Sequence, residues 1–526
     1  MRKRAARHGL TLAIVAAAAA VAAGCGSSGS SARATARATG TTSAVAGAAR
    51  PAGSWADPNG DLANTRDVAG ARISAANVAQ LKEAWTYRLP AAAAKNLEDT
   101  GSLAAAPVVV NGVVYLQDLY ANVYAISLAT GKLKWEYAVN VAEKTGPGPD
   151  GVAVAAGVVY GTTPTTVFAL NAATGAVLWT DKHLLASGQG TFEIQPAVAA
   201  GRVYLASAYG AAPGGGVLLA LDASTGRKLW SFSTVTGGQP AGVSSLGLGS
   251  GGAWETPLVA ADGSVTFGIG NPYQTLGGAI SHPAADLYTD SEVNLDAATG
   301  RLRWYYQAEP NDFRDWDIQL SPISATAGGV PAIISGGKMG DVYAFNAATG
   351  ALLWKTPVGV HNGHDNDSRL LLEHKLKITL PYTYEPGPLG GVLTDMAVAD
   401  GSVYVATIDL PFTFTKLTSV NGTPASTKAA GEIDALNLAT GKVEWRAMVA
   451  SLPLGAATVS DDLVFTTLLS GELIALNRST GAIVYQAKLP AAANSPIAVT
   501  SNAILVPAGG PGAAANDNAQ LVAYSI

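Results

Sequence analysis

Residues 344–354 read AFNAATGALLW, and this pattern, which decides the fold, occurs seven times between residues 125 and 485. Its constant parts are an apolar residue, an Asn or Asp in most copies, a small residue, Thr-Gly, and an aromatic residue four positions after the glycine. The copies are AISLATGKLKW (125–135), ALNAATGAVLW (169–179), ALDASTGRKLW (220–230), NLDAATGRLRW (294–304), AFNAATGALLW (344–354), ALNLATGKVEW (435–445) and ALNRSTGAIVY (475–485).

A strand-like run precedes each copy, such as VVVNGVVYLQ at 108–117 and GRVYLASA at 201–208. Alternating β-branched and aromatic residues favour strands. Asn or Asp before Thr-Gly caps a tight turn, and the glycine supplies its positive φ. A unit of about 40–50 residues with several strands cannot bury its apolar face alone. The units are therefore expected to pack side by side, with the aromatic residue buried between neighbours. The repeat therefore predicts an all-β β-propeller.

The aromatic residues that close each unit predict eight blades. They are Trp85, Trp135, Trp179, Trp230, Trp304, Trp354, Trp445 and Tyr485. Trp85 has no motif strand before it, and the last residues, AQLVAYSI, form a motif-like strand with no aromatic after it. We therefore expect the N-terminal strand to complete the blade that the C-terminus begins, closing the ring. The long intervals 230–304 and 354–445 mark insertions, and loops on a rigid scaffold are where function usually resides.

Composition excludes several classes of protein. The 526 residues are 48% hydrophobic and 13% charged, which excludes disorder for most of the chain. With 33 Lys and Arg against 38 Asp and Glu, and no long basic run, we expect no nucleic-acid partner. A single cysteine excludes a disulfide within the chain. Length alone suggests about three domains, but the repeat reduces them to one.

The N-terminus is typical of an export signal. Four basic residues lie within residues 1–10, and a short apolar run follows at 11–23. The run ends in VAAGC at 21–25, which resembles the lipobox of bacterial lipoproteins. That resemblance implies a signal peptide at 1–24, a lipidated Cys25 and a protein anchored at the outer face of the membrane. The alternative is an ordinary signal peptide with an incidental cysteine. The small, polar stretch 25–53 is expected to be a flexible tether, and 54–526 the propeller domain.

The repeat resembles the tryptophan-docking motif of eight-bladed quinoprotein dehydrogenases, and the segment DLANTR at 61–66 resembles the opening segment of that family. The resemblance spans roughly 55 to 526. It implies a dehydrogenase that oxidises an alcohol or sugar with pyrroloquinoline quinone (PQQ) and calcium. No CxxCH haem motif is present, so an enzyme would need an external electron acceptor. A related family of scaffold lipoproteins in outer-membrane assembly shares the repeat without chemistry, and a non-catalytic binding or assembly scaffold is the alternative.

The resemblance also implies four site residues. Trp254, in GGAWETP, would form the floor beneath the quinone, and the side-chain oxygen of Asn271, in GIGNP, would ligate the calcium. Asp317, the end of EPNDFRDWD, would be the catalytic base and a possible metal ligand. Lys338, in SGGKMG, would contact the quinone oxygens. Core packing, a turn, a solvated loop and a surface lysine are the respective structural alternatives. Asp312 and Asp315 are rivals for the role of Asp317, because this segment is longer than in the family.

Several positions depart from the family pattern. Ala211 stands where the family has a Glu calcium ligand, and Asp150 where it tends to have Arg. Val392-Leu393 replaces an Asn-Trp pair, and the family's adjacent cysteine pair is absent. Losing a carboxylate weakens a calcium site, for which Glu193 or Glu255 are candidate replacements.

The insertion sequence HNGHDND at 361–367 places two His and two Asp within seven residues. His and carboxylate groups suit zinc or similar ions. We interpret the stretch as a polar insertion loop, with a metal site as the alternative.

Overall fold

The computed structural model describes residues 54–68, 70–90, 101–141, 150–208, 215–235, 251–426, 429–510 and 519–526. The signal peptide, Cys25 and the tether predicted at 1–53 lie outside the described residues, and so does Ala211. Nearly all of the regular secondary structure in the described residues is strand, and the all-β propeller fold predicted from the repeat is confirmed.

Successive strands form antiparallel sheets that follow one another along the chain. Within the described ranges, six sheets have four strands, two have five and one has three. The first three comprise β3 (Val108–Val110), β4 (Val113–Gln117), β5 (Val123–Ser127) and β6 (Leu133–Tyr137); β7 (Ala153–Ala155), β8 (Val158–Thr162), β9 (Val167–Asn171) and β10 (Val177–Asp181); and β11 (Thr191–Phe192), β12 (Ala197–Ala199), β13 (Arg202–Ala208), β14 (Val217–Asp222) and β15 (Lys228–Ser233).

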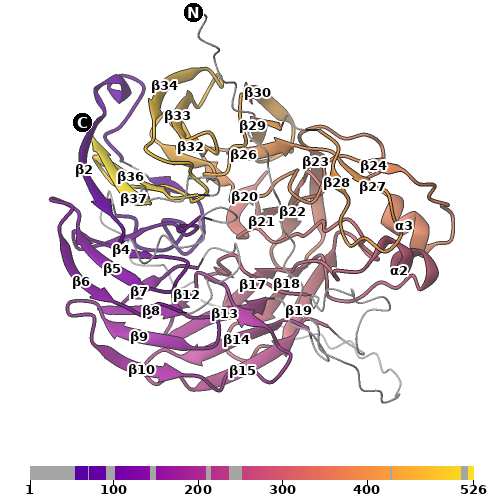
Figure 1. The fold of residues 1–526 in the computed structure, drawn as a ribbon, viewed down its shortest axis with the longest axis horizontal. Coiled ribbons are helices and arrows are strands. Elements are labelled where there is room, and N and C mark those ends of the chain that lie inside the picture. The colour runs from indigo at the N-terminus through magenta and orange to yellow at the C-terminus, as the bar shows by residue number, and fades with distance from the viewer. Residues whose placement is uncertain are drawn as a thin grey trace, which may run out of the picture.

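The next sheets repeat this order. They comprise β16 (Leu258–Val259), β17 (Ser264–Gly268), β18 (Ser291–Asp296) and β19 (Leu302–Gln307); β20 (Ile323–Ala327), β21 (Val330–Gly336), β22 (Asp341–Asn346) and β23 (Leu352–Pro357); and β25 (Ala397–Ala399), β26 (Ser402–Asp409), β29 (Ala430–Asn437) and β30 (Val443–Val449). Figure 1 shows the sheets succeeding one another around the molecule, with colours running from indigo through magenta and orange to yellow.

The last two sheets join the two ends of the described chain. They comprise β31 (Thr458–Ser460), β32 (Leu463–Leu468), β33 (Glu472–Asn477) and β34 (Ile483–Lys488) with β1 (Asp67–Val68); and β35 (Ala498–Val499), β36 (Ala503–Ala508) and β37 (Gln520–Ser525) with β2 (Lys82–Arg88). β2 pairs antiparallel with β37, and Trp85 lies opposite Ala523. In Figure 1 the indigo β2 lies beside the yellow β36 and β37.

Each motif tryptophan packs on the glycine of the next Thr-Gly turn. A Cβ on any of these glycines would lie 2.5–2.7 Å from the indole, so only glycine fits there. Each indole Nε1 also donates to a main-chain carbonyl of that turn at 2.7–3.1 Å. The pairs are Trp85–Gly131, Trp135–Gly175, Trp179–Gly226, Trp230–Gly300, Trp304–Gly350, Trp354–Gly441 and Trp445–Gly481. The predicted packing of these tryptophans against neighbouring units is confirmed, although only Trp230 and Trp304 are buried and the other five are partly exposed.

The N-terminal segment before β2 is held by a buried arginine. Arg66 is fully buried and donates to Asn59 Oδ1 at 2.6 Å, to the Ala457 carbonyl at 2.8 Å and to Thr458 Oγ1 at 2.7 Å. Its guanidinium also lies 5.2 Å from the centre of the buried Trp55 ring. A short 3-10 helix, η1 (Val78–Gln80), then leads into β2.

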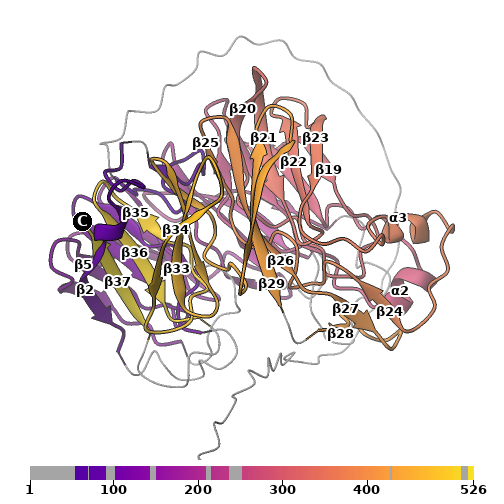
Figure 2. The ribbon, with the colours of Figure 1, turned by 90° about the horizontal axis from the view of Figure 1, so that it is seen from above.

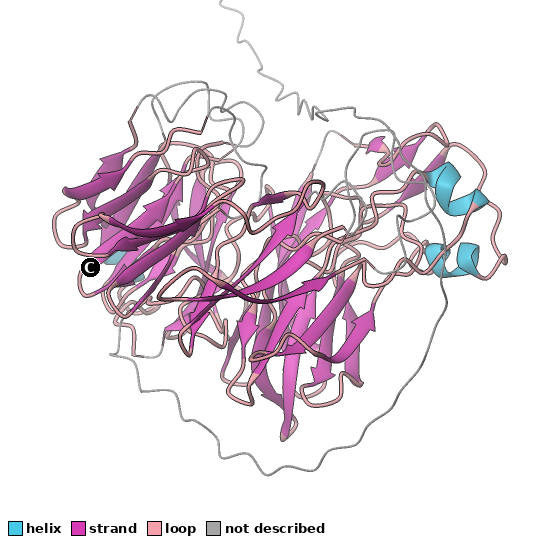
Figure 3. Cartoon of the chain, turned by 90° about the horizontal axis from the view of Figure 1, so that it is seen from below, coloured by secondary structure: helices cyan, strands magenta, loops and turns pink. Residues whose placement is uncertain are grey.

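The two predicted insertions pack against each other. The first carries α2 (Leu276–Ser281), and the second carries α3 (Asp367–Leu372) and the three-stranded sheet of β24 (Tyr382–Tyr384), β27 (Phe412–Phe414) and β28 (Thr423–Pro424). Figure 2 and Figure 3 show α2 and α3 together at one side of the molecule, away from the main sheets. The aromatic rings at the base of these insertions are buried in a single hydrophobic cluster with Trp316. Among the described helices, none is long and apolar enough to cross a membrane.

Candidate functional site

Backbone hydrogen bonds place the Trp254 segment beside the Asn271 segment. The amide of Gly270 donates to the Gly252 carbonyl at 2.8 Å, and the amide of Gly251 donates to the Asn271 carbonyl at 3.0 Å. Asn271 follows β17, and this pairing brings two stretches of the first insertion side by side. The side chain of Trp254 is therefore fixed close to the loop that carries Asn271.

Asp317 meets the Trp254 ring at Gly270. A Cβ on Gly270 would lie 2.6 Å from Trp254 Cη2 and 2.9 Å from Asp317 Oδ1, so the absence of a side chain lets both groups approach. The backbone amide of Asn271 donates to the same Asp317 oxygen at 2.7 Å. Three of the four residues singled out in the sequence thus share one small region.

Lys338 completes the group. It lies in the turn between β21 and β22, where its own amide donates to the Asp317 carbonyl at 3.0 Å. Its buried ammonium forms ion pairs with Asp317 Oδ2 and, at 3.1 Å, with Asp315 Oδ1. The structure therefore brings together Trp254, Asn271, Asp317 and Lys338, which lie up to 84 residues apart in the sequence.

The carboxamide of Asn271 is oriented with its oxygen unused. Its Nδ2 donates to Asp315 Oδ1 at 2.6 Å, whereas Oδ1 is buried and has no hydrogen-bond partner in the described part of the chain. A buried acceptor without a donor calls for an explanation, and a hard cation that prefers oxygen ligands supplies one. The unpartnered oxygen of Asn271 therefore has the chemistry of a metal ligand. Among the described residues, no group of three or more His, Cys, Asp or Glu side chains that could hold a metal ion occurs.

The two rival carboxylates are occupied by other partners. Asp312 accepts the backbone amides of Arg314 at 3.0 Å and Trp316 at 2.9 Å, so it shapes the turn. Asp315 has φ 63°, and its carboxylate accepts from three side chains, those of Asn271, Lys338 and Asn421. Backbone in this left-handed region is uncommon outside glycine and often marks functional segments.

Burial and neighbouring charges shift several pKa values here. Burial raises the pKa of Asp315 above its ordinary value, and the Lys338 ammonium opposes this shift. Burial alone would lower the pKa of Lys338, but Asp315 and Asp317 outweigh it and hold this pKa above its ordinary value. Lys338 therefore stays charged at neutral pH, and perturbed titrating groups of this kind cluster at functional sites.

Two nearby residues were not anticipated from the sequence. Asn421, between β27 and β28, donates through Nδ2 to Asp315 Oδ2 at 3.1 Å. Asp290 is fully buried, and burial together with Asp312 and Asp317 raises its pKa well above the ordinary value. No motif surrounds Asn421. An acid just before the motif strand at 291–296 was the one available signal for Asp290.

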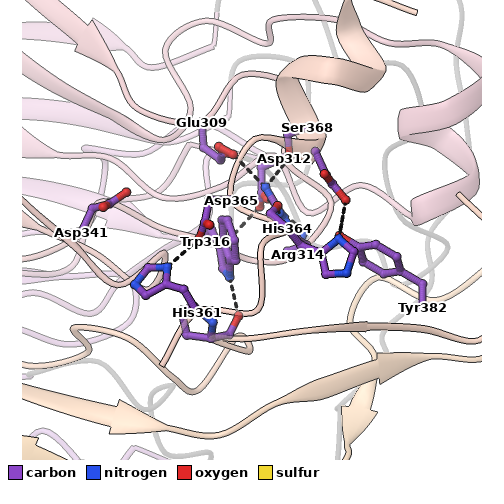
Figure 4. A network of polar contacts seen from close by, with 12 residues as sticks. Glu309, Asp312, Arg314, Trp316, Asp341, His361, His364, Asp365, Ser368 and Tyr382 are labelled. Atoms are coloured by element: carbon purple, nitrogen blue, oxygen red, sulfur yellow. Dashed lines mark hydrogen bonds and ion pairs between the residues drawn. The ribbon is translucent and has the colours of Figure 1, made fainter. Parts of the chain in front are cut away.

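A second polar network centres on Arg314, three residues before Asp317 in the sequence (Figure 4). Arg314 is fully buried, with its guanidinium 3.4 Å from the centre of the Trp316 ring. It pairs with Glu309 at 2.7 Å and donates to Ser368 Oγ at 2.9 Å. Because Ser368 belongs to α3, this network fixes the segment 309–317 to the second insertion.

The HNGHDND stretch contains two separate pairs. His361 Nδ1 lies 2.5 Å from Asp365 Oδ1, and His364 Nδ1 lies 2.8 Å from Asp367 Oδ2. Figure 4 shows the two imidazoles directed at different carboxylates. Each histidine thus has its own partner within the insertion loop.

The positions that depart from the family pattern can be placed in part. Val392 donates its amide to the Gly337 carbonyl at 3.0 Å, so this apolar segment borders the Lys338 turn. Burial, together with the nearby negative charge of Asp395, raises the pKa of Glu255 well above its ordinary value. Glu193 is buried and accepts from Thr191 Oγ1 at 3.0 Å.

Comparison with known proteins gives the family. The model of the glucose/ethanol/alcohol dehydrogenase β-propeller domain matches residues 55–359, and that of the outer membrane protein assembly factor BamB matches 429–526. A quinohemoprotein alcohol dehydrogenase of Comamonas testosteroni is 26% identical over 386 residues, covering 64% of this chain and 51% of that protein. The chain spans about half the length of the curated relatives it matches.

Two solved structures show the shared fold. A quinohemoprotein alcohol dehydrogenase of Pseudomonas putida HK5 superposes with a TM-score of 0.74 at 21% identity, covering 90% of this chain and 80% of that one. A europium-containing methanol dehydrogenase superposes with a TM-score of 0.75 at 19% identity, covering 91% and 99%. The resemblance inferred from the repeat is thereby confirmed. With its family model matching more than half of the sequence, this chain belongs to the family of glucose, ethanol and alcohol dehydrogenase β-propeller domains.

Proposed function

We propose that this protein is a PQQ-dependent dehydrogenase that oxidises an alcohol or a sugar with the help of a calcium ion. The observation that carries the proposal is the meeting of Trp254, Asp317 and Asn271 at Gly270, with Lys338 paired to Asp317. Repeats explain the fold but require no such cluster of a carboxylate, a cation and an unused carboxamide oxygen. The names of the relatives, which are quinoprotein and quinohemoprotein alcohol dehydrogenases, support the same activity.

Each residue of the cluster has a chemical role in this proposal. The indole of Trp254 offers a flat apolar surface on which a planar ring system stacks. Oxygens of Asn271 and Asp317 would hold the calcium ion. When bound, PQQ supplies a two-electron acceptor for the hydride of the alcohol carbon.

The proton and charge movements fall to Asp317 and Lys338. The carboxylate of Asp317 accepts the proton of the substrate hydroxyl, as a general base. The buried ammonium of Lys338 lies against that carboxylate and offsets negative charge there. The electrons then leave for an external acceptor, because the sequence carries no haem attachment motif.

We infer that the sheets form one closed, eight-bladed ring. Eight sheets follow the repeat in order, and the pairing of β2 with β37 supplies the last blade from both ends of the chain. Such closure stabilises a propeller because the hydrogen bonds between β2 and β37 hold both ends of the chain in one blade.

We also propose that Cys25 carries a lipid that anchors the protein at the outer face of the membrane. The support is the basic start, the short apolar run and the single cysteine at the lipobox position. Replacing Cys25 by Ala should release the protein from the membrane fraction and abolish labelling by radioactive palmitate. Labelling that persists in C25A would contradict the anchor.

A non-catalytic scaffold lipoprotein is the second candidate. The BamB model supports it, but its match at 429–526 contains none of the four clustered residues. Three departures from the family pattern also favour this candidate: the missing Glu at Ala211, the missing Arg at Asp150 and the absent cysteine pair.

Binding of the cofactor separates the two candidates. The full chain is purified and titrated with PQQ in the presence and absence of calcium, and bound quinone is followed by its absorbance. Dye-linked oxidation of ethanol and of glucose is then measured. Trp254→Ala should weaken quinone binding, whereas Leu353→Ala, an exposed site on β23, should not. No binding at micromolar PQQ with calcium would overturn the enzyme and favour the scaffold.

A further inference from the structure

Asp315 joins three parts of the chain at one carboxylate. Its Oδ1 accepts Asn271 Nδ2 at 2.6 Å and pairs with Lys338 Nζ at 3.1 Å, while its Oδ2 accepts Asn421 Nδ2 at 3.1 Å. These donors come from the first insertion, from the turn between β21 and β22, and from the loop between β27 and β28. Both carboxylate oxygens are therefore fully engaged in holding other side chains.

The contact with Asn271 decides which end of that carboxamide is presented. Oδ1 of Asp315 already receives the Lys338 ammonium and acts as an acceptor, so Nδ2 of Asn271 faces it and Oδ1 of Asn271 faces away. The oxygen that faces away is buried and has no donor among the residues described. Without the carboxylate, the amide is free to rotate by half a turn and present its NH₂ group instead. Asp315 thus selects an oxygen ligand at this position.

The contact with Lys338 divides one ammonium between two anions. Lys338 pairs with Asp317 and with Asp315, and its side chain is buried. A base must be free to accept a proton, and an ammonium held by a single carboxylate would suppress that role. The second anion draws part of the Lys338 charge away from Asp317.

Asn421 is placed on Asp315 by the packing of the two insertions. The Leu417 carbonyl accepts the amide of Gly277 at 2.7 Å, and the Ser419 carbonyl accepts the amide of Leu276 at 3.1 Å. These bonds dock the loop between β27 and β28 on the N-terminal end of α2. The position of Asn421 is therefore set by the insertions and not by the propeller repeat.

We propose that Asp315 and Asn421 form a positioning pair, through which the second insertion fixes the carboxamide of Asn271 and the ammonium of Lys338. The inference rests on the proposed function, because the groups it positions are those assigned to metal and quinone. The pair touches neither substrate nor quinone in this role. In this proposal Asp315 is a positioning residue, and Asp317 remains the candidate for the catalytic base.

The first test needs no cofactor. Thermal unfolding of the full chain is compared for wild type, N421A, D315A and the double variant. N421A should lower the midpoint by a few degrees in the wild-type background and not measurably in D315A, since residues in one network are not additive. Thr423→Ala, at an exposed position of β28, is the matched control and should leave the midpoint unchanged in both backgrounds. An equal effect of N421A in both backgrounds overturns the pair.

The second test measures what the pair positions. The calcium affinity of the quinone-loaded protein is measured for wild type, N421A, D315A and Asn421→Gln, and kcat and KM are determined in parallel. D315A should weaken calcium binding at least tenfold, N421A severalfold, and Asn421→Gln should restore part of the loss. Wild-type protein that binds neither quinone nor calcium overturns the proposed function and this role together. Wild-type binding that is unchanged in both alanine variants overturns the positioning pair alone.

Discussion

The backbone amide of Asn271 donates a hydrogen bond to Oδ1 of Asp317 at 2.7 Å, across 46 residues of sequence. This bond fixes the rotation of the carboxylate, so that Oδ2 faces the ammonium of Lys338. Asn271 follows β17 and Asp317 precedes β20, so the bond also links one sheet to the next. The carboxylate is therefore oriented by the scaffold before any ligand binds, which is what efficient proton transfer requires.

Substitution of Asp317 by Asn should separate chemistry from folding. The amide oxygen can still accept the Asn271 amide, but the side chain cannot take up a proton. We expect kcat to fall about 10²- to 10⁴-fold, the range for loss of a general base. The protein should stay folded, with an unfolding midpoint lowered by the loss of the buried ion pair to Lys338, as measured by differential scanning calorimetry. Asp400→Asn, an exposed carboxylate that pairs with Arg478, is the control and should keep full activity. Undiminished turnover in D317N would exclude Asp317 as the base.

Replacing either of two glycines with the same backbone conformation by alanine should lower the free energy of unfolding, but by different amounts. Gly481 and Gly112 have φ 71° and 73°. A Cβ on Gly481 would lie 2.5 Å from Trp445 Cε3, whereas one on Gly112 would meet nothing within 4 Å. G112A should cost about 1 kcal/mol of unfolding free energy, from the left-handed backbone alone. G481A should cost about 1–3 kcal/mol more, from overpacking. Equal costs in chemical denaturation would mean that the indole does not depend on this close approach.

The repeat made the propeller and its docking contacts predictable, because strand, turn and aromatic residue are encoded within eleven neighbouring residues. The four clustered residues were reached through short motifs of the resembled family. Asn421 could not be predicted in this way, because its position depends on how the two insertions, which contain no sequence repeat, pack on each other. The burial of Arg66 was equally invisible, since its carbonyl partner Ala457 lies 391 residues away.

His361 should make stability depend on pH near neutrality. Its Nδ1 faces Asp365 at 2.5 Å and its Nε2 the Val358 carbonyl at 3.0 Å, so the doubly protonated ring satisfies both acceptors. Burial lowers the pKa of His361, but the bond to Asp365 and the nearby charge of Asp341 outweigh it and raise the pKa above 6.5. A raised pKa gives stability that is fully present below the unfolded value and is lost as pH rises through the folded value.

The expected outcome for His361 is a difference that disappears on the alkaline side. Unfolding midpoints of wild type and His361→Gln are compared from pH 5.5 to 8.5, with the wild type more stable at the acid end and the two converging as pH rises. His183→Gln, an exposed histidine in the loop after β10, should reproduce the wild-type profile. A constant difference between wild type and His361→Gln across this range would mean that folding does not shift the pKa of this ring.

Glu292, like His361, should make the folded protein less stable as pH rises, but over a wider pH range. It lies on β18, fully buried, and accepts a hydrogen bond from Ser335 on β21 of the next sheet. Its Oε2 has no hydrogen-bond partner within the described ranges. Burial raises the pKa of Glu292 from 4.5 to about 8, with the Ser335 bond opposing the shift. The folded protein therefore prefers the neutral acid, and the associated stability is lost as pH rises from 4.5 through 8.

Glu292→Gln replaces that neutral acid by a group of the same shape that never ionises. The variant should match the wild type at pH 5 and unfold at a higher temperature than the wild type at pH 9, where the wild-type carboxylate must carry a buried charge. Glu136→Gln, an exposed position on β6, serves as the control and should shift neither midpoint. If Glu292→Gln is instead destabilised to the same degree at both values, the carboxylate is ionised in the folded state and bonded in that form. The hydrogen bond from Ser335 would then be accepted by a charged Glu292 carboxylate.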